Sequence, residues 1–230
     1  MKKLKNNPKL FFVMVGVCII FILFYAFFLR SSNAYDYLKI DKSQSFVYTI
    51  SEEEKGYYYQ YMPFINLKGD VGTYVNQDIA SFYQNFNQDD ICITYDSNLN
   101  GKVLSLIIKV EDYSYAESAA IYYFKSYNIN LEREELVDDN TLFGYFNLTS
   151  DNVQTILNQK IEEYYQELAD DKSINKSCNY QCFFKERQFE DGLSDVAFYV
   201  REGKLIAYKP YINIGETDED LMIHEFEITN

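Results

Sequence analysis

The chain contains no tryptophan, one histidine, three prolines and four cysteines among its 230 residues. A single histidine excludes sites that need two imidazoles, including helical zinc sites with paired histidines. Bases are also scarce, because 21 lysines and arginines stand against 35 acids, giving a formal net charge of -14. A surface of that sign repels phosphate, so we expect no nucleic-acid partner. Apolar residues at 47% and charged residues at 24% are typical of a folded domain.

The first thirty residues differ from the rest, because they contain five bases and no acid. Residues 10–29 form an uncharged apolar run, and a helix of twenty residues spans about 30 Å, the thickness of a bilayer core. Four lysines precede this run, which predicts a cytoplasmic tail at 1–9 and an extracellular remainder with a net charge of -19. We therefore expect a single-pass protein of the cell membrane, with a polar linker at 30–45 and an extracellular domain at 46–230.

A secreted protein is the alternative to this anchored one. Ser32-Asn33-Ala34 has the small residues that a signal peptidase accepts, so cleavage near Ala34 would release the domain. The apolar run is longer than the roughly 7–15 residues of a usual signal peptide, which favours the uncleaved anchor.

Two stretches have apolar residues at helical spacing and predict amphipathic helices at 70–86 and 150–169. Asp70 is the expected N-cap of the first helix, and Thr149 or Ser150 that of the second. An apolar stripe must be buried against another element, so we expect each helix to pack on a sheet. The side chains expected to face that sheet include Phe82 and Ile156.

The remaining segments are rich in aromatic and β-branched residues and predict strands. Strands are expected at 46–50, 57–67, 91–95, 102–110, 121–131, 196–200, 205–208 and 221–228. The run 52–56 and the run 96–101, which ends in Asn-Gly, are expected to form turns. The pattern predicts an α+β fold, with an antiparallel sheet packed against two main helices and preceded by a single N-terminal transmembrane helix.

Short motifs in the outer region resemble those of one extracellular module. They are Tyr113-Ser114-Tyr115, Tyr127-Asn128-Ile129-Asn130-Leu131, Leu136 with Asp139 and Leu142-Phe143, the helix at 150–169, and Tyr208-Lys209-Pro210-Tyr211-Ile212-Asn213-Ile214. Over residues 57–229 the chain is similar to the C-terminal domain of RsiV-type anti-sigma factors, which also occurs in PdaC-type peptidoglycan deacetylases. The resemblance implies an envelope-facing binding or sensing module of bacteria, which in RsiV-type proteins is a lysozyme receptor.

The chain departs from that family at several places. Glu117-Ser118-Ala119-Ala120 stands where many members have Gly-Gly-Ala-His, and Ile212 replaces a typical glutamate. Only nine residues precede the apolar run, so we expect no anti-sigma segment and no deacetylase domain. The resemblance therefore extends to the outer module alone, and the ligand stays open.

Four tyrosines close together, Tyr57, Tyr58, Tyr59 and Tyr61, are candidate ligand contacts. Tyrosines stack on sugars and anchor protein interfaces. A compositional bias is the alternative, because the chain has 23 tyrosines in all. The acidic clusters lack the spacing of a calcium loop, so we expect solvated loops whose summed charge steers a basic protein toward the domain. We expect no bound metal and no cofactor.

Cys178 and Cys182 are a candidate disulfide, since a bond can persist outside the membrane; free thiols are the alternative. Cys92 lies in an apolar strand and is expected to be a buried apolar residue. His224 shares a strand face with apolar neighbours, which favours a core position over a catalytic one. No serine or cysteine motif accompanies this histidine, so we expect no catalytic residue and no enzymatic activity.

These features together predict a membrane-anchored extracytoplasmic domain that binds or senses a ligand. Its partners are expected to be the membrane and either a basic, lysozyme-like extracellular protein or peptidoglycan. One alternative is an accessory component of a cell-envelope assembly for secretion or conjugation. Another is a carboxylate-dependent cell-wall hydrolase, because a pair of acids in suitable geometry can arise from distant residues.

Overall fold

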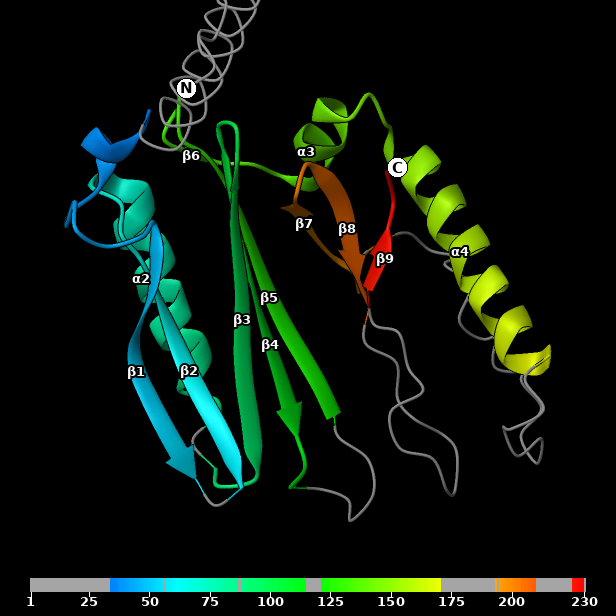
Figure 1. Ribbon diagram of the computed structural model, residues 1–230, viewed down its shortest axis with the longest axis horizontal. Coiled ribbons are helices and arrows are strands. Elements are labelled where there is room, and N and C mark those ends of the chain that lie inside the picture. Colours follow the sequence, from blue (N-terminus) through cyan, green and yellow to red (C-terminus); the bar gives the residue numbers. More distant parts are fainter. Residues whose placement is uncertain are drawn as a thin grey trace, which may run out of the picture.

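The computed structural model describes residues 34–55, 57–86, 88–114, 121–170, 193, 195–209 and 225–229. Its largest element is a six-stranded sheet in which the strands follow one another in chain order (Figure 1). The strands are β1 (Val47–Lys55), β2 (Tyr58–Ile65), β3 (Ile91–Asn100), β4 (Val103–Asp112), β5 (Ile121–Asn130) and β6 (Glu135–Leu136). Neighbouring strands are antiparallel, except that β2 and β3 are parallel.

Helix α2 (Gly69–Tyr83) connects the two parallel strands, since parallel neighbours need a crossover connection. It covers one face of the large sheet, where Val75 and Ile79 are fully buried. The helix predicted at 70–86 is therefore confirmed, but the prediction of Asp70 as its N-cap is wrong. The helix begins at Gly69, which has a φ of 83°; the N-cap residue is Lys68, whose side chain makes no capping hydrogen bond, and Asp70 lies in the first turn.

A second, three-stranded antiparallel sheet lies against the other face of the large sheet. Its strands are β7 (Ala197–Arg201), β8 (Lys204–Tyr208) and β9 (Glu225–Glu227). Ile107 and Phe124 of the large sheet pack against Tyr199 and Ile206 of the small one. Helices α3 (Asp139–Tyr145) and α4 (Ser150–Asp170) cover the outer side of the small sheet, so the layers run helix, sheet, sheet, helix (Figure 1).

Two buried polar side chains of the large sheet bind the backbone of β7. The Ser105 hydroxyl donates to the Asn128 amide oxygen at 2.6 Å and accepts the Val200 backbone N–H at 3.0 Å. The Asn128 amide nitrogen donates to the Phe198 carbonyl at 2.8 Å. Buried polar groups cost free energy unless they are hydrogen-bonded, so this arrangement both satisfies the pair and fixes where β7 lies.

The helix predicted at 150–169 is confirmed almost to the residue. Thr149 and Asn152 exchange hydrogen bonds at its start, which supports the predicted cap, and Val153, Leu157 and Ile161 are fully buried. Helix α3 was not expected, because its seven residues hold too few turns to show a periodic stripe. Asp138 caps α3 by accepting the Thr141 backbone N–H at 2.9 Å.

Hairpins join the strands at the two places where turns were predicted, but the predicted turns at 52–56 and 96–101 are too long. Glu52–Lys55 continue β1, paired residue by residue with Tyr58–Tyr61, and Asp96–Asn100 continue β3, paired with β4 as far as Val103. The polar residues suggested turns there. Cross-strand pairing, however, keeps the backbone extended even where the side chains are polar and exposed. The β3–β4 turn is only Gly101–Lys102, where Gly101 has a φ of 57°.

The described part of the predicted linker, residues 34–45, lies against the domain. Leu38 is buried in the core of the large sheet, and its carbonyl accepts the Lys68 backbone N–H at 2.9 Å. The amide nitrogen of Asn66 donates to the carbonyls of Asp41 and Ser45. Among the described residues, no helix is long and apolar enough to cross a membrane, and the predicted span at 10–29 lies outside them.

Candidate functional site

The four predicted tyrosines lie on and beside the turn that joins β1 to β2. Tyr57 is in the turn and is 97% exposed. Tyr58 stacks on Tyr113 with ring centroids 4.9 Å apart, whereas Tyr59 and Tyr61 stack on each other at 6.1 Å. Because side chains alternate along a strand, Tyr58 belongs to one face of the hairpin and the Tyr59–Tyr61 pair to the other. The structure therefore divides the predicted cluster between two surfaces.

The first surface combines the tyrosine pair with acids, and we call Glu52, Glu54, Tyr59 and Tyr61 the acidic-aromatic face. Glu52 is directly opposite Tyr61 in the sheet, and Glu54 is opposite Tyr59. Both glutamates are exposed, and Tyr59 is 44% exposed. Partial desolvation and the nearby Glu52 carboxylate raise the pKa of Tyr61, so this phenol stays neutral and can donate a hydrogen bond.

The opposite face of the same hairpin lines a groove of about 310 Å³. Helix α2 and the residues after it form the other wall. The lining side chains are Ser51, Glu53, Lys55, Gln60, Met62, Ala80, Tyr83, Gln84 and Phe86. A volume of this size lies at the lower end of the range found for small-ligand sites, about 300–1,000 Å³.

Several groove residues are held in place by hydrogen bonds. The Gln60 amide nitrogen donates to the carbonyls of Gln88 at 3.1 Å and Ile91 at 3.3 Å. The Tyr83 hydroxyl donates to the Tyr61 carbonyl, and burial raises the pKa of Tyr83. Glu53 is the one carboxylate in this lining, whereas most sugar hydrolases use a facing pair of carboxylates.

The hairpin turn is at one end of the domain and the N-terminal segment is at the other. In Figure 1, residues 34–45 lie at the top, and β1 runs downward so that its turn into β2 is at the bottom. Nine residues of strand extend about 30 Å. A chain held at its N-terminal end would thus present the tyrosines and glutamates at its far end.

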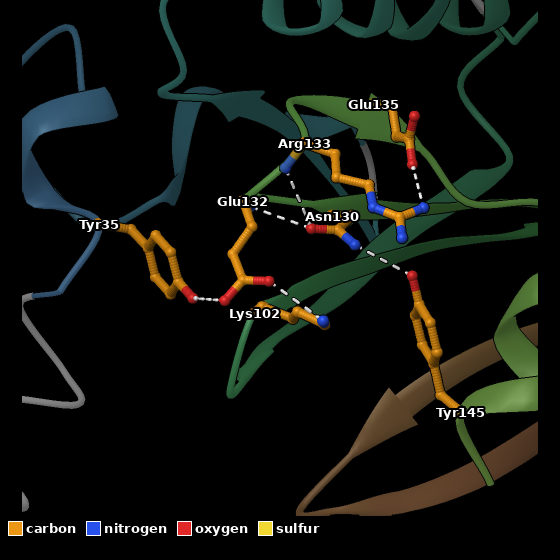
Figure 2. A network of polar contacts seen from close by, with 7 residues as sticks. All are labelled: Tyr35, Lys102, Asn130, Glu132, Arg133, Glu135 and Tyr145. Atoms are coloured by element: carbon orange, nitrogen blue, oxygen red, sulfur yellow. Dashed lines mark hydrogen bonds and ion pairs between the residues drawn. The ribbon is translucent and has the colours of Figure 1, made fainter.

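A network of polar contacts fixes the N-terminal end of the domain (Figure 2). The Tyr35 hydroxyl donates to Glu132 at 3.4 Å, and Glu132 also pairs with Lys102 at 3.1 Å. The hydrogen bond from Lys102 lowers the pKa of Glu132, although the carboxylate is exposed. Asn130 is fully buried and bonds the Tyr145 hydroxyl at 3.0 Å. This network ties residue 35 to β5 and α3, which gives it a structural role.

A second charged cluster, absent from the sequence predictions, lies between the two sheets. The ammonium of Lys109 contacts Glu225 at 2.5 Å and Asp96 at 2.8 Å, and Arg201 contacts Glu225 at 2.8 Å. Burial raises the pKa of Glu225, but hydrogen bonds from its neighbours outweigh burial and hold that pKa below its usual value. Four strands supply these groups, β3 and β4 of the large sheet and β7 and β9 of the small one, so no local motif could reveal them. Each charge has a partner, which is typical of a structural tie between sheets.

The other predicted candidates divide into two groups. Cys178, Cys182 and His224 lie outside the described residues, so their predictions stay untested. Cys92 is a free thiol that is half-buried rather than buried, and desolvation raises its pKa, which makes it a weak nucleophile. Within the described part of the chain, no group of three or more histidine, cysteine or acidic residues could hold a metal ion.

Comparisons with known proteins leave the family open. No family model matches the chain, and no curated protein matches it at a significant level. The resemblance to the outer module of RsiV-type anti-sigma factors therefore stays a prediction.

Proposed function

We propose that the protein is a membrane-anchored extracytoplasmic domain that binds or senses a cationic ligand, with the acidic-aromatic face as its contact surface. The observation that carries this proposal is the pairing of exposed glutamates with stacked tyrosines at the end of the domain farthest from residues 34–45. Tyrosine rings supply contact area at low entropic cost, and the carboxylates attract and orient a basic partner.

The anchor belongs to the same proposal. The apolar run at 10–29 would form a transmembrane helix with residues 1–9 in the cytoplasm, and the tightly attached segment 34–45 would hold the domain close to the bilayer. The hairpin turn would then point away from the membrane. A lysozyme-like protein is the first ligand to test, because it is basic and the family resemblance implies it; peptidoglycan is the second.

Binding is best tested with the full chain in nanodiscs of zwitterionic lipid. Hen-type lysozyme should bind at low salt and retain binding above 0.15 M salt, where the Debye length is about 8 Å. A cytochrome of similar charge should lose its binding there, because it lacks specific contacts. The double variant Glu52→Lys/Glu54→Lys should weaken lysozyme binding at least about tenfold, since it reverses two charges on the contact face.

The matched control is Glu134→Lys, which makes the same kind of charge change in the exposed turn before β6. It should change the affinity less than about twofold, because that turn lies at the other end of the domain. If lysozyme does not bind at low salt, or if the control weakens binding as much as the double variant does, the contact surface proposed here is wrong.

The side of the membrane on which the domain lies needs a separate measurement. Tyr57→Cys places a thiol at a 97% exposed position in the hairpin turn. A thiol reagent that does not cross membranes should label this variant in intact cells above the level of the unmodified chain. Labelling only after lysis would show that the domain is inside the cell.

A further inference from the structure

We infer that the outer edge of β1 accepts an extended cationic segment of a partner as an additional strand of the sheet. This inference rests on the function proposed above and specifies how the ligand would be held. Strand addition at a free sheet edge is a recurrent mode of recognition, in which backbone hydrogen bonds give affinity and alternate side chains give specificity.

The free edge is the first observation. Strand β1 is the last strand on its side of the six-stranded sheet, and among the described residues none pairs with it on its outer side. At the opposite edge, β6 has only two residues. The ladder between β1 and β2 is irregular between Thr49 and Ser51, where Ile50 is bulged, and is continuous from Ser51 to Lys55. An added strand therefore has about five residues, or roughly 17 Å, of regular edge to pair with.

The charge of that edge selects the partner. Glu52, Glu53 and Glu54 occupy three consecutive positions within the regular stretch, and all three are exposed. A second copy of the chain would bring glutamates opposite glutamates. Pairing of two copies is therefore disfavoured, because like charges directly opposite each other destabilise a strand pair. A segment with lysine or arginine at alternate positions would instead place its cations beside Glu52 and Glu54.

The groove side of β1 is what the remaining side chains of the added strand, those between its cations, would face. Glu53 and Lys55 point to the face of β1 that lines the groove, and a salt bridge of 3.5 Å joins them. Side chains of an added strand that point to this face would lie beside Ser51, Glu53 and Lys55, which line the groove from β1. The edge thus offers two glutamates backed by tyrosines on one face and a polar and charged row on the other.

Glutamates on an edge strand have a second explanation, which is protection against aggregation. The two explanations differ in whether the backbone of β1 pairs with a ligand. The probe is a nine-residue peptide of alternating lysine and threonine with blocked ends, titrated into the full chain in nanodiscs. Two further peptides carry N-methyl groups, one on every lysine and the other on every threonine, so all three have the same charge.

Strand addition predicts that the two methylated peptides behave differently. Alternate residues of a strand direct their N–H groups toward one neighbour, so one methylated form should bind at least about tenfold more weakly and the other within about threefold of the parent. Hydrogen exchange at the amides of 51–55 should slow only with the forms that bind. If both methylated peptides bind as well as the parent, the inference is overturned and the attraction is electrostatic.

The lysozyme titration separates the inference from the proposed function. Lysozyme binding that depends on Glu52 and Glu54, combined with equal binding of both methylated peptides, would overturn strand addition and leave the proposed function in place. Failure of lysozyme and of the parent peptide at low salt would overturn both.

Discussion

Strands β1 and β4 belong to one sheet and have similar lengths, but their surroundings differ. Eight of the ten residues of β4 are buried, whereas only Val47 is buried among the nine residues of β1. Strand β4 is covered on one face by α2 and on the other by the small sheet. Toward its end, β1 has three exposed glutamates in a row, and one of its faces lines the open groove beside α2. Stability therefore concentrates in the layered centre, while the hairpin end is free to vary or to bind.

Replacement of a core leucine should give the largest loss of stability. Leu157 on α4 is fully buried beneath the small sheet, so Leu157→Ala should lower the free energy of unfolding by about 2–5 kcal/mol through lost burial and a cavity. Tyr59→Ala on the acidic-aromatic face should cost less than about 1 kcal/mol, because that ring is 44% exposed. Urea unfolding of the full chain in detergent measures both.

Half-buried positions should fall between these limits. Phe82 and Ile156 contact the core, as the sequence predicted, but both are only partly buried. Ile156→Ala should therefore cost clearly less than Leu157→Ala. Equal losses for Leu157→Ala and Tyr59→Ala would contradict the contrast between centre and hairpin.

Removal of the buried amide between the sheets should have the next largest effect. Asn128→Leu keeps the volume but leaves the Phe198 carbonyl and the Ser105 hydroxyl without their partner, which should cost about 1–3 kcal/mol. Asn140→Leu is the control, because Asn140 is exposed in the first turn of α3, and it should change stability by less than about 0.5 kcal/mol. Comparable thermal midpoints for the two variants would argue against a stabilising role for the hydrogen bonds of Asn128.

The charged cluster between the sheets should make stability depend on pH. The pKa of Glu225 is lowered in the folded protein, so its contribution is present above the usual glutamate value near 4.5 and is lost as the pH falls through the folded value. Glu225→Gln should cost about 1 kcal/mol at neutral pH, since the Glu225 carboxylate is partly buried and solvent still screens it, and it should flatten the loss of stability on acidification below about pH 5.

The matched variant for this experiment is Glu227→Gln on the same strand. Glu227 pairs with Lys204 at 2.6 Å, but the carboxylate is exposed, so the pH profile should change less than with Glu225→Gln. Thermal unfolding midpoints between pH 3.5 and pH 7 measure both. The structural role of the cluster would be refuted by identical acid profiles for the unmodified chain and Glu225→Gln.

Charge reversals on exposed residues should have the smallest effect on stability. Glu54→Lys in β1 and Glu134→Lys in the turn before β6 should each shift the free energy of unfolding by less than about 0.5 kcal/mol. Lysozyme affinity should nevertheless fall for Glu54→Lys alone. A loss of stability above 1 kcal/mol for Glu54→Lys would show that the hairpin supports the fold, and the contrast with the centre would then fail.

Periodic patterns in the sequence predicted the long elements that bury one face. The stripe of α4, with Val153, Leu157 and Ile161, is confirmed because a helix of 21 residues repeats its pattern over several turns. Strand ends were predicted poorly, since Glu52 and Asp96 are polar and yet extended. Their conformation is set by pairing with β2 and β4, and that pairing is not encoded in local residue type.

The sequence pointed to the tyrosine cluster as a candidate, but it did not predict how the cluster is arranged. Tyr57, Tyr58, Tyr59 and Tyr61 were recognisable as a cluster, but only the strand alternation and the register with Glu52 and Glu54 divide them between two faces. The groove could not be predicted, because Tyr83 and Phe86 come to line it only when α2 packs against the hairpin.

By itself, the sequence determined the acidic balance, the apolar run at 10–29, the two long helices and the approximate positions of the strands, because composition and periodicity are local properties. The tertiary structure decided the parallel pairing of β2 with β3, the small sheet over the large one, and the meeting of Lys109, Asp96 and Glu225. These features depend on contacts between residues far apart in sequence, such as Lys109 and Glu225, which are 116 positions apart. The free energy of such contacts arises only when the layers assemble and water is excluded between them.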